Sequence, residues 1–246
     1  TTLLSGSYDT FGQLEQPYTL QLAVAPDGLA YVGVRYPEPG DDTAAQLHAQ
    51  LFGEQLAGDA FSTDVYVTRV AADGARLGTS VVSSPHLDEL YGLRAFAGAA
   101  YALGRSEHKS DQGTGHQALL ARVEAGSGAV SLRELDLDRG DVAFDVLELD
   151  ADRLLLVGAS GYWQNPRGAS ISEECVPFAR LLHADGGSAA LTLPSGPRHG
   201  EARAVIATEL GRVVLAGMLD GPGTHSADAD SALLSARGFL IELTRP

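Results

Sequence analysis

The most regular feature of the chain is a pair of short apolar runs separated by a tight turn, which recurs four times. An apolar run, a short turn and a second apolar run form the pattern of a β-hairpin. The first runs lie at residues 20–25, 93–97, 146–149 and 204–207. The second runs each end in glycine and are Leu29–Gly33, Ala99–Gly104, Arg153–Gly158 and Arg212–Gly217.

A third apolar run follows each hairpin, at residues 64–70, 117–123, 176–182 and 237–243. In three copies it contains an arginine before an aliphatic residue and then reaches a glycine turn. A fourth run follows in three copies, at residues 79–83, 130–135 and 189–193. The predicted unit therefore has four strands.

Four such units account for the whole chain and recur about every 60 residues, which is a period typical of propeller blades. We predict an all-β fold, a four-bladed β-propeller of four-stranded antiparallel blades in one domain, residues 1–246. The blades are expected at about residues 14–84, 85–137, 138–195 and 196–246, the last one with residues 1–7. The last blade lacks a fourth strand, and Thr1–Gly6 has the pattern of one. We expect this N-terminal strand to close the ring, because closure removes two open sheet edges. The alternatives are a larger ring and a ring completed by another copy.

The two recurring motifs resemble the degenerate propeller repeats of bacterial secreted and surface proteins. One motif is arginine, an aliphatic residue and then an Asp-Gly turn, as in Arg69–Gly74 and Arg180–Gly186. The other is the strand that ends in an aliphatic residue, one further residue and glycine. The resemblance covers nearly the whole chain and concerns architecture. It implies a binding scaffold in an extracellular, periplasmic or cell-surface location.

The connections between the second and third strands are expected to be long, at residues 34–63, 105–116, 159–175 and 218–236. The turns within the hairpins are short. Long loops in a compact domain commonly carry function, so we place the ligand site on the face that these connections form, the long-loop face. The first connection has apolar residues at helical spacing, which predicts one short helix from Asp42-Thr43 to Gly58. This helix is expected either to pack on the propeller or to act as a lid.

Composition excludes several classes of function. The net charge is −15 and the pI about 4.7, which argues against a nucleic-acid partner, because phosphate contacts need clustered basic residues. No apolar run reaches the roughly 18 residues of a membrane span. Cys175 is the only cysteine, which excludes an internal disulfide and paired-cysteine metal motifs.

Aromatic residues on the long-loop face are the candidate ligand-binding groups. They are Tyr36, Tyr162 and Trp163, with Arg167 nearby. Exposed aromatic rings stack on sugars and anchor protein partners, so the first function hypothesis is a binding module for a protein, glycan or small-molecule ligand. The alternative for Trp163 is that it covers the core between two blades.

Histidines and acids on the same face give the alternative hypothesis, an enzyme. Such a lyase, cyclase or hydrolase would use His108, His116 and His225, brought together with acids from several blades. A divalent metal is the cofactor that this hypothesis allows. Zn²⁺ would be bound by histidines, with His48 as one ligand, and Ca²⁺ by the alternating carboxylates of Asp228 and Asp230. The sequence leaves open whether the chain is an enzyme.

A set of acids precedes the first strand of each unit: Glu15, Asp88, Asp141 and Glu201. A group that repeats in every blade points to structure, since a catalytic site occurs once. We expect these acids to accept hydrogen bonds from backbone N–H groups or to pair with Arg69, Arg122 and Arg180.

Overall fold

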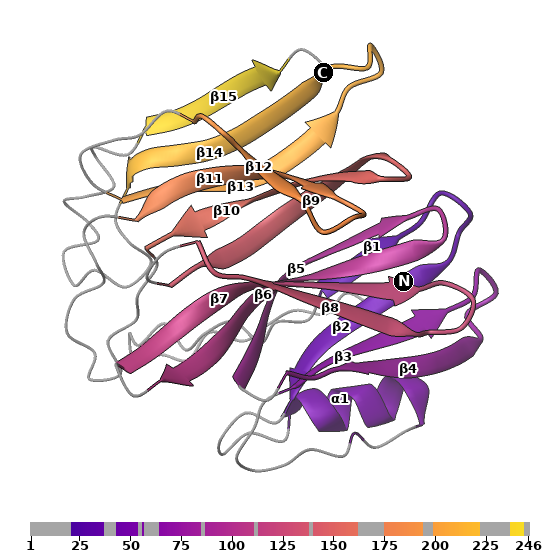
Figure 1. The fold of residues 1–246 in the computed structure, drawn as a ribbon. Helices are drawn as coiled ribbons and strands as arrows, with labels where there is room; N and C mark the ends of the chain where they lie inside the picture. Colours follow the sequence, from indigo (N-terminus) through magenta and orange to yellow (C-terminus); the bar gives the residue numbers. More distant parts are fainter. Residues whose placement is uncertain are drawn as a thin grey trace.

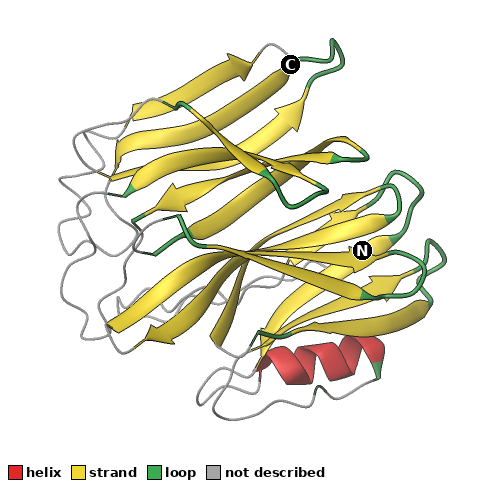
Figure 2. Cartoon of the chain, in the orientation of Figure 1, coloured by secondary structure: helices red, strands yellow, loops and turns green. Residues whose placement is uncertain are grey.

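The protein is all-β and consists of four antiparallel sheets in a computed structural model (Figure 1). The structure describes residues 21–36, 43–53, 56, 64–84, 87–110, 113–137, 140–161, 175–193, 199–221 and 237–243. Within these ranges strands dominate, and α1 (Thr43–Phe52) is the one helix (Figure 2). The prediction of an all-β fold with one short helix is confirmed.

The four sheets follow one another along the chain. The first contains β1 (Gln21–Val24), β2 (Ala30–Tyr36), β3 (Asp64–Val70) and β4 (Arg76–Val82). The second contains β5 (Leu87–Phe96), β6 (Ala99–Ser110), β7 (Gly113–Glu124) and β8 (Val130–Leu135). The third contains β9 (Val142–Asp150), β10 (Arg153–Ser160), β11 (Val176–His183) and β12 (Ser188–Leu191). The fourth contains β13 (His199–Ala207), β14 (Val213–Gly221) and β15 (Arg237–Leu243). Each sheet falls within one predicted repeat unit, and Thr1–Gly6 lies outside the described residues.

The sheets pack on one another in the same way three times. The first strand of each sheet lies across the first three strands of the sheet before it: β5 contacts β1, β2 and β3, β9 contacts β5, β6 and β7, and β13 contacts β9, β10 and β11. The short turns gather at one end, to the right in Figure 1. We call the other end, where β5, β9 and β13 begin and β2, β6, β10 and β14 finish, the long-loop face.

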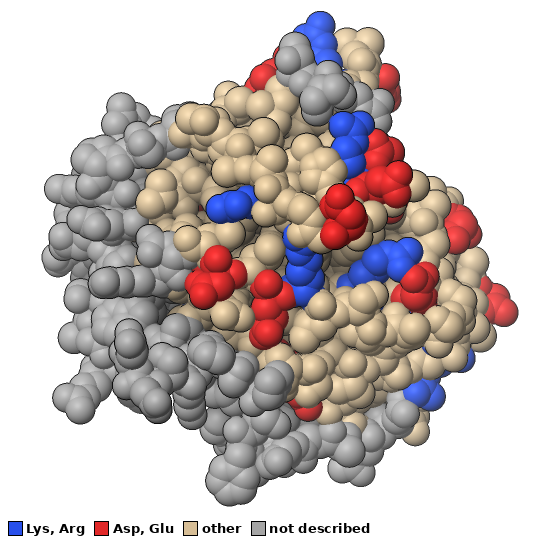
Figure 3. All heavy atoms as spheres, in the orientation of Figure 1, with Lys and Arg blue, Asp and Glu red and all other residues tan. Residues whose placement is uncertain are grey.

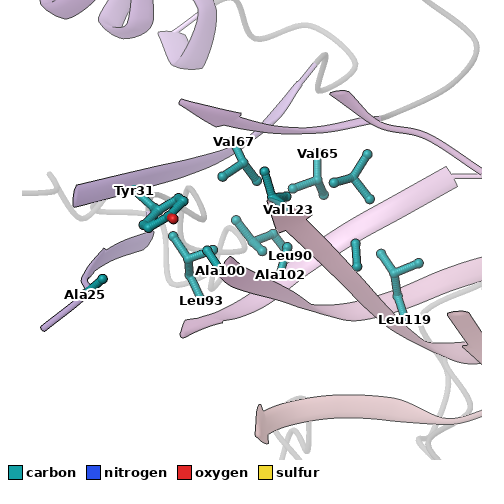
Figure 4. Packing of buried hydrophobic residues seen from close by; sticks show 12 residues of the cluster. Ala25, Tyr31, Val65, Val67, Leu90, Leu93, Ala100, Ala102, Leu119 and Val123 are labelled. Atoms are coloured by element: carbon teal, nitrogen blue, oxygen red, sulfur yellow. The ribbon is translucent and has the colours of Figure 1, made fainter. Parts of the chain in front are cut away.

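Separate apolar cores fill the three interfaces between sheets. In the first core, Tyr31, Val65 and Val67 of the first sheet face Leu90 and Leu93 of β5 (Figure 4). The side chains of these five residues are almost fully buried. Two similar cores join the second sheet to the third and the third to the fourth. Burial of this apolar surface is the main force that holds the sheets together.

The recurring glycine of the second strand has a structural cause. Gly104, Gly158 and Gly217 pair with Leu90, Ala143 and Ala202, and the next residue of each first strand is a β-bulge. The bulge brings a carbonyl oxygen of the first strand against the glycine. A Cβ at these three positions would collide with the carbonyl oxygens of Glu89, Val142 and Glu201, respectively. Only glycine therefore fits opposite the bulge.

The first sheet departs from this rule. Tyr31 is opposite Arg69 in the first sheet, and Tyr101 is opposite Arg122 in the second, so Tyr31 and Tyr101 are equivalent positions. Val34 and Gly104 each lie three residues after these tyrosines and are therefore equivalent as well. Aligning Gly33 with the other three glycines was therefore wrong by one residue. Gly33 instead faces the second sheet, where a Cβ would press on Leu90.

Helix α1 packs on the outer side of the first sheet, the side turned away from the second. Its buried His48 ring bonds to Thr68 of β3, with 2.8 Å between Nε2 and Oγ1. The helix ends at Gly53, which has a φ of 69° and donates its N–H to Ala49, and not at Gly58 as expected. A left-handed glycine directly after the last turn is a common helix stop.

One of the four predicted long connections is mostly strand. β6 continues to Ser110 and β7 starts at Gly113. The two strands pair regularly, from Ala99 opposite Glu124 at one end to Ser110 opposite Gly113 at the other. The prediction of a loop over residues 105–116 was wrong. Its polar residues extend a hairpin ladder, which backbone hydrogen bonds stabilise whether or not the side chains enter a core.

Candidate functional site

The three β-bulges place three side chains at equivalent positions near the long-loop face. The extra residues are Tyr91 in β5, Phe144 in β9 and Arg203 in β13. We call them and their charged neighbours the inner-strand cluster: Arg35, Glu89, Tyr91, Arg105, Phe144, Glu201 and Arg203. The position in the first sheet with the same register, residue 20, lies outside the described residues.

The bulged side chains contact one another across the sheets. The rings of Tyr91 and Phe144 meet edge to face, with 5.9 Å between their centroids. The Arg203 guanidinium lies over the Phe144 ring, 3.9 Å from its centroid, and the Arg105 guanidinium lies 5.8 Å from the Tyr91 centroid. Cation–π contacts of this kind stabilise a guanidinium without neutralising it. The arrangement joins three sheets through one stack.

Glu89 is the acidic centre of the cluster. Its carboxylate accepts hydrogen bonds from Arg105 Nε at 2.5 Å and from the Tyr91 hydroxyl at 2.7 Å, and Arg35 Nη1 lies 3.4 Å away. Burial alone would raise the pKa of Glu89, but Arg105, Arg35 and the Tyr91 hydroxyl outweigh it and lower the pKa to about 2. Glu89 therefore remains ionised at neutral pH.

Glu201 and Arg203 repeat this arrangement in the fourth sheet. The Arg203 Nε donates to the fully buried Glu201 carboxylate, while the Arg203 side chain itself remains 39% exposed. Cys175 is also buried here, and burial followed by the charge of Glu201 raises the pKa of its thiol. The thiol is therefore protonated, which is unfavourable for a nucleophile.

His116 is buried beside the Glu89–Arg105 pair. Burial and the charge of Arg105 lower its pKa to about 4, against the opposite effect of Glu89. No hydrogen bond to its Nδ1 is found within the described residues. Its imidazole is therefore neutral at pH 7.

Asp145 holds three successive sheets together. Its carboxylate accepts hydrogen bonds from Arg94 Nη2 of β5 at 2.6 Å and from the backbone N–H of Val205 of β13 at 2.8 Å. This residue was not among those predicted from the sequence. The available signal was one carboxylate inside an otherwise apolar strand, since a buried charge needs partners.

The repeated acids prove to be structural in two cases. Asp88 accepts the Ser84 N–H at 2.7 Å and Asp141 accepts the Leu137 N–H at 2.5 Å, and both carboxylates are fully buried. Glu201 was placed one residue out of register, because it corresponds to Glu89 and not to Asp88. The prediction that these acids pair with Arg69 was wrong, because Arg69 donates to the carbonyls of Ala125 and Gly126 in the next sheet.

Most of the residues singled out from the sequence lie outside the described part of the chain. These are Tyr162, Trp163, Arg167, His225, Asp228 and Asp230. Tyr36 is the last residue of β2, opposite Asp64, and His108 lies on β6, opposite Gly115. Of the predicted site residues that the structure describes, His116 is the one whose pKa the charges of Arg105 and Glu89 in the inner-strand cluster shift. These roles stay predictions.

The metal hypothesis gains no further ligands in the described residues. His48 is 2% exposed, bonded to Thr68 and packed against Phe52, with 4.9 Å between the ring centroids. No group of three His, Cys, Asp or Glu side chains in the described ranges is arranged to hold an ion. Likewise, none of the described helical structure is both long and apolar enough to cross a membrane.

No protein-family model matches the chain, and no curated protein matches it.

Proposed function

We propose that this chain is a propeller-type binding module of a bacterial secreted or surface protein, which holds a protein or glycan ligand on its long-loop face. One observation carries the proposal. The glycine opposite the bulge is the same in three sheets, whereas the bulged residue differs: Tyr91, Phe144 and Arg203. A position that serves only the fold would repeat like the glycine. Variation on a repeated backbone suits a site adapted to a ligand.

The chemistry of the cluster favours binding over catalysis. Arg203 offers an exposed guanidinium whose orientation Phe144 and Glu201 restrict, which lowers the entropic cost of engaging a ligand. Arginine and tyrosine are the side chains that most often dominate protein interfaces. Among the described residues, by contrast, the buried Cys175 thiol and the neutral His116 lack the paired geometry of a nucleophile and its base. An enzyme site built on His108 or His225 is the alternative.

The proposed module is a closed four-bladed ring. In each interface the first strand of one sheet covers the face of the sheet before it, and closure would set β1 on β13–β15 in the same way. Leu22 occupies the position in the first sheet that Leu93 occupies in the second sheet and Val205 in the fourth. Leu22 is 67% exposed, whereas Leu93 is 7% exposed and Val205 is 1% exposed. In the fourth sheet, Leu240 occupies the position that Leu120 occupies in the second sheet. Leu240 is 77% exposed, whereas Leu120 is 4% exposed.

Two exposed apolar positions with the pattern of a buried interface are thus left over, one on each terminal sheet; on the first sheet α1 covers another part of the same face. Joining them would bury side chains worth roughly 1.5–3 kcal/mol each. The fourth strand of the last sheet would come from Thr1–Gly6, which would pair with the edge of β15 that no described strand occupies. Extracellular, periplasmic or cell-surface location follows from the resemblance to secreted propeller repeats.

A binding screen with matched variants tests the function. Labelled protein is applied to an array that carries glycans and purified cell-surface proteins. We expect binding to at least one spot, weakened about 10- to 100-fold by Arg203→Gln, the range for losing a charged hydrogen bond. Arg212→Gln is the control, because Arg212 forms an exposed ion pair with Glu242 at the opposite end of the fold. Binding to no spot, or equal binding by Arg203→Gln, would contradict the proposal.

A further inference from the structure

A groove lies between the second and third sheets at the short-turn end, away from the inner-strand cluster. Its volume is about 380 Å³, near the lower limit for small-molecule sites. Basic and acidic side chains gather around this position in Figure 3. Its polar lining comprises Tyr101, Arg122, Ser131, Arg133, Glu148, Asp152 and His183.

The groove lies beside an arginine that takes a different course here than its counterpart in the neighbouring interface. Between the first and second sheets, Arg69 Nη1 crosses the gap and donates to the carbonyls of Ala125 and Gly126, at 2.7 and 2.8 Å. Arg122 has the same register, opposite Tyr101. Its hydrogen bonds, however, go to Glu124 and Tyr101 within its own sheet. Here Arg133 of β8 makes the crossing instead, with its Nη2 donating to the carbonyl of Gly186 at 2.7 Å, and the groove lies beside Arg122.

The opposite wall presents a carboxylate, that of Glu148, to which no described protein group donates a hydrogen bond. Glu148 is half-buried in β9, and burial raises its pKa while the charge of Arg122 opposes the rise. Within the described residues no hydrogen bond to the Glu148 carboxylate is found. Its oxygens border the groove, where the hydroxyl groups of a ligand can donate to them.

The balance of groups selects the class of ligand. Two guanidiniums and two carboxylates line the groove, which disfavours both a cation and an anion. Leu120, Leu154 and Leu182 add apolar surface. A sugar ring matches this lining, because each hydroxyl both donates and accepts and the C–H faces pack on leucine.

We propose that this groove binds a neutral saccharide of one or two rings, with Glu148 accepting and Arg122 donating hydrogen bonds to its hydroxyls. The site lies at the opposite end of the sheets from the inner-strand cluster. It does not depend on the function proposed above.

Titration followed by ¹H–¹⁵N NMR tests the proposal. The probes are glucose, galactose, mannose, N-acetylglucosamine, lactose and maltose, each up to tens of millimolar. We expect at least one sugar to shift the amide signals of Ser131, Asp152 and Ala184 in a saturable manner. Glu148→Gln, which keeps the shape of the side chain, should weaken binding at least fivefold.

Glu134→Gln is the matched control, because Glu134 is exposed on β8 and does not line the groove. This variant should bind like the wild type, and the melting temperature of each variant verifies its fold. Failure of every sugar to shift these signals would overturn the proposal, as would unchanged affinity in Glu148→Gln. Sugar binding that Arg203→Gln abolishes and Glu148→Gln spares would place the saccharide at the inner-strand cluster and also overturn it.

Discussion

The backbone of Gly104 lies directly against the carbonyl oxygen of Glu89, so closely that residue 104 has no room for a Cβ. The contact follows from the β-bulge at Tyr91, and it recurs between Gly158 and Val142 and between Gly217 and Glu201. The most visible sequence marker of the repeat is therefore a consequence of how the fold positions its candidate site.

Replacing this glycine should destabilise the fold. In Gly104→Ala the new methyl group must displace the Glu89 carbonyl and the bulge, which we expect to cost about 1–3 kcal/mol of unfolding free energy. Gly126→Ala is the control, because a Cβ there meets nothing within 4 Å. Urea denaturation measures both variants. Equal stability of the two would show that the bulge adapts without strain.

Stability should fall between pH 7.5 and 5.0 because of His116. Its pKa is about 4 in the folded protein and 6.5 in the unfolded chain. Below pH 6.5 the unfolded chain therefore binds a proton that the folded protein does not, and the unfolding free energy decreases by about 2 kcal/mol by pH 5.0. His116→Leu should lose less stability than the wild type over this interval. Urea titrations at the two pH values compare the two proteins, and an equal loss would contradict the assignment.

Cys175 should report on unfolding. The thiol is 1% exposed, and its raised pKa keeps it protonated. Ellman's reagent should leave the native protein unmodified for hours and modify one thiol per chain within minutes in concentrated guanidinium chloride. Rapid reaction without denaturant would show that the core around Phe144 and Cys175 opens easily.

Ring closure should bring Leu22 close to Leu240. The test protein carries Leu22→Cys and Leu240→Cys, with Cys175→Ala to remove the native thiol. A short bismaleimide should link the two cysteines within one chain, which mass spectrometry detects at the mass of the monomer.

The control protein carries Leu77→Cys in place of Leu22→Cys, together with the other two substitutions. Leu77 is 52% exposed on the outer strand β4, and this pair should link less. Links that join two chains would support the alternative, a ring completed by another copy. No link in either protein would contradict closure.

Local patterns in the sequence were sufficient to predict the strands, their grouping into four units and the helix in the first connection. Alternation of apolar residues and tight turns depends on neighbours along the chain, so it can be read without a tertiary structure. The limits of this information appear at residues 105–116, where polar side chains suggested a loop and backbone pairing extends a hairpin.

The candidate site was decided by tertiary structure. Tyr91, Phe144 and Arg203 look unrelated in the sequence, and no spacing links Arg122 to Glu148. Their meeting depends on a one-residue bulge in three strands and on how one sheet lies across the next. The glycine that faces each bulge is visible in the sequence. The carbonyl that requires it comes from a strand about 15 residues away, and only the paired sheet brings the two together.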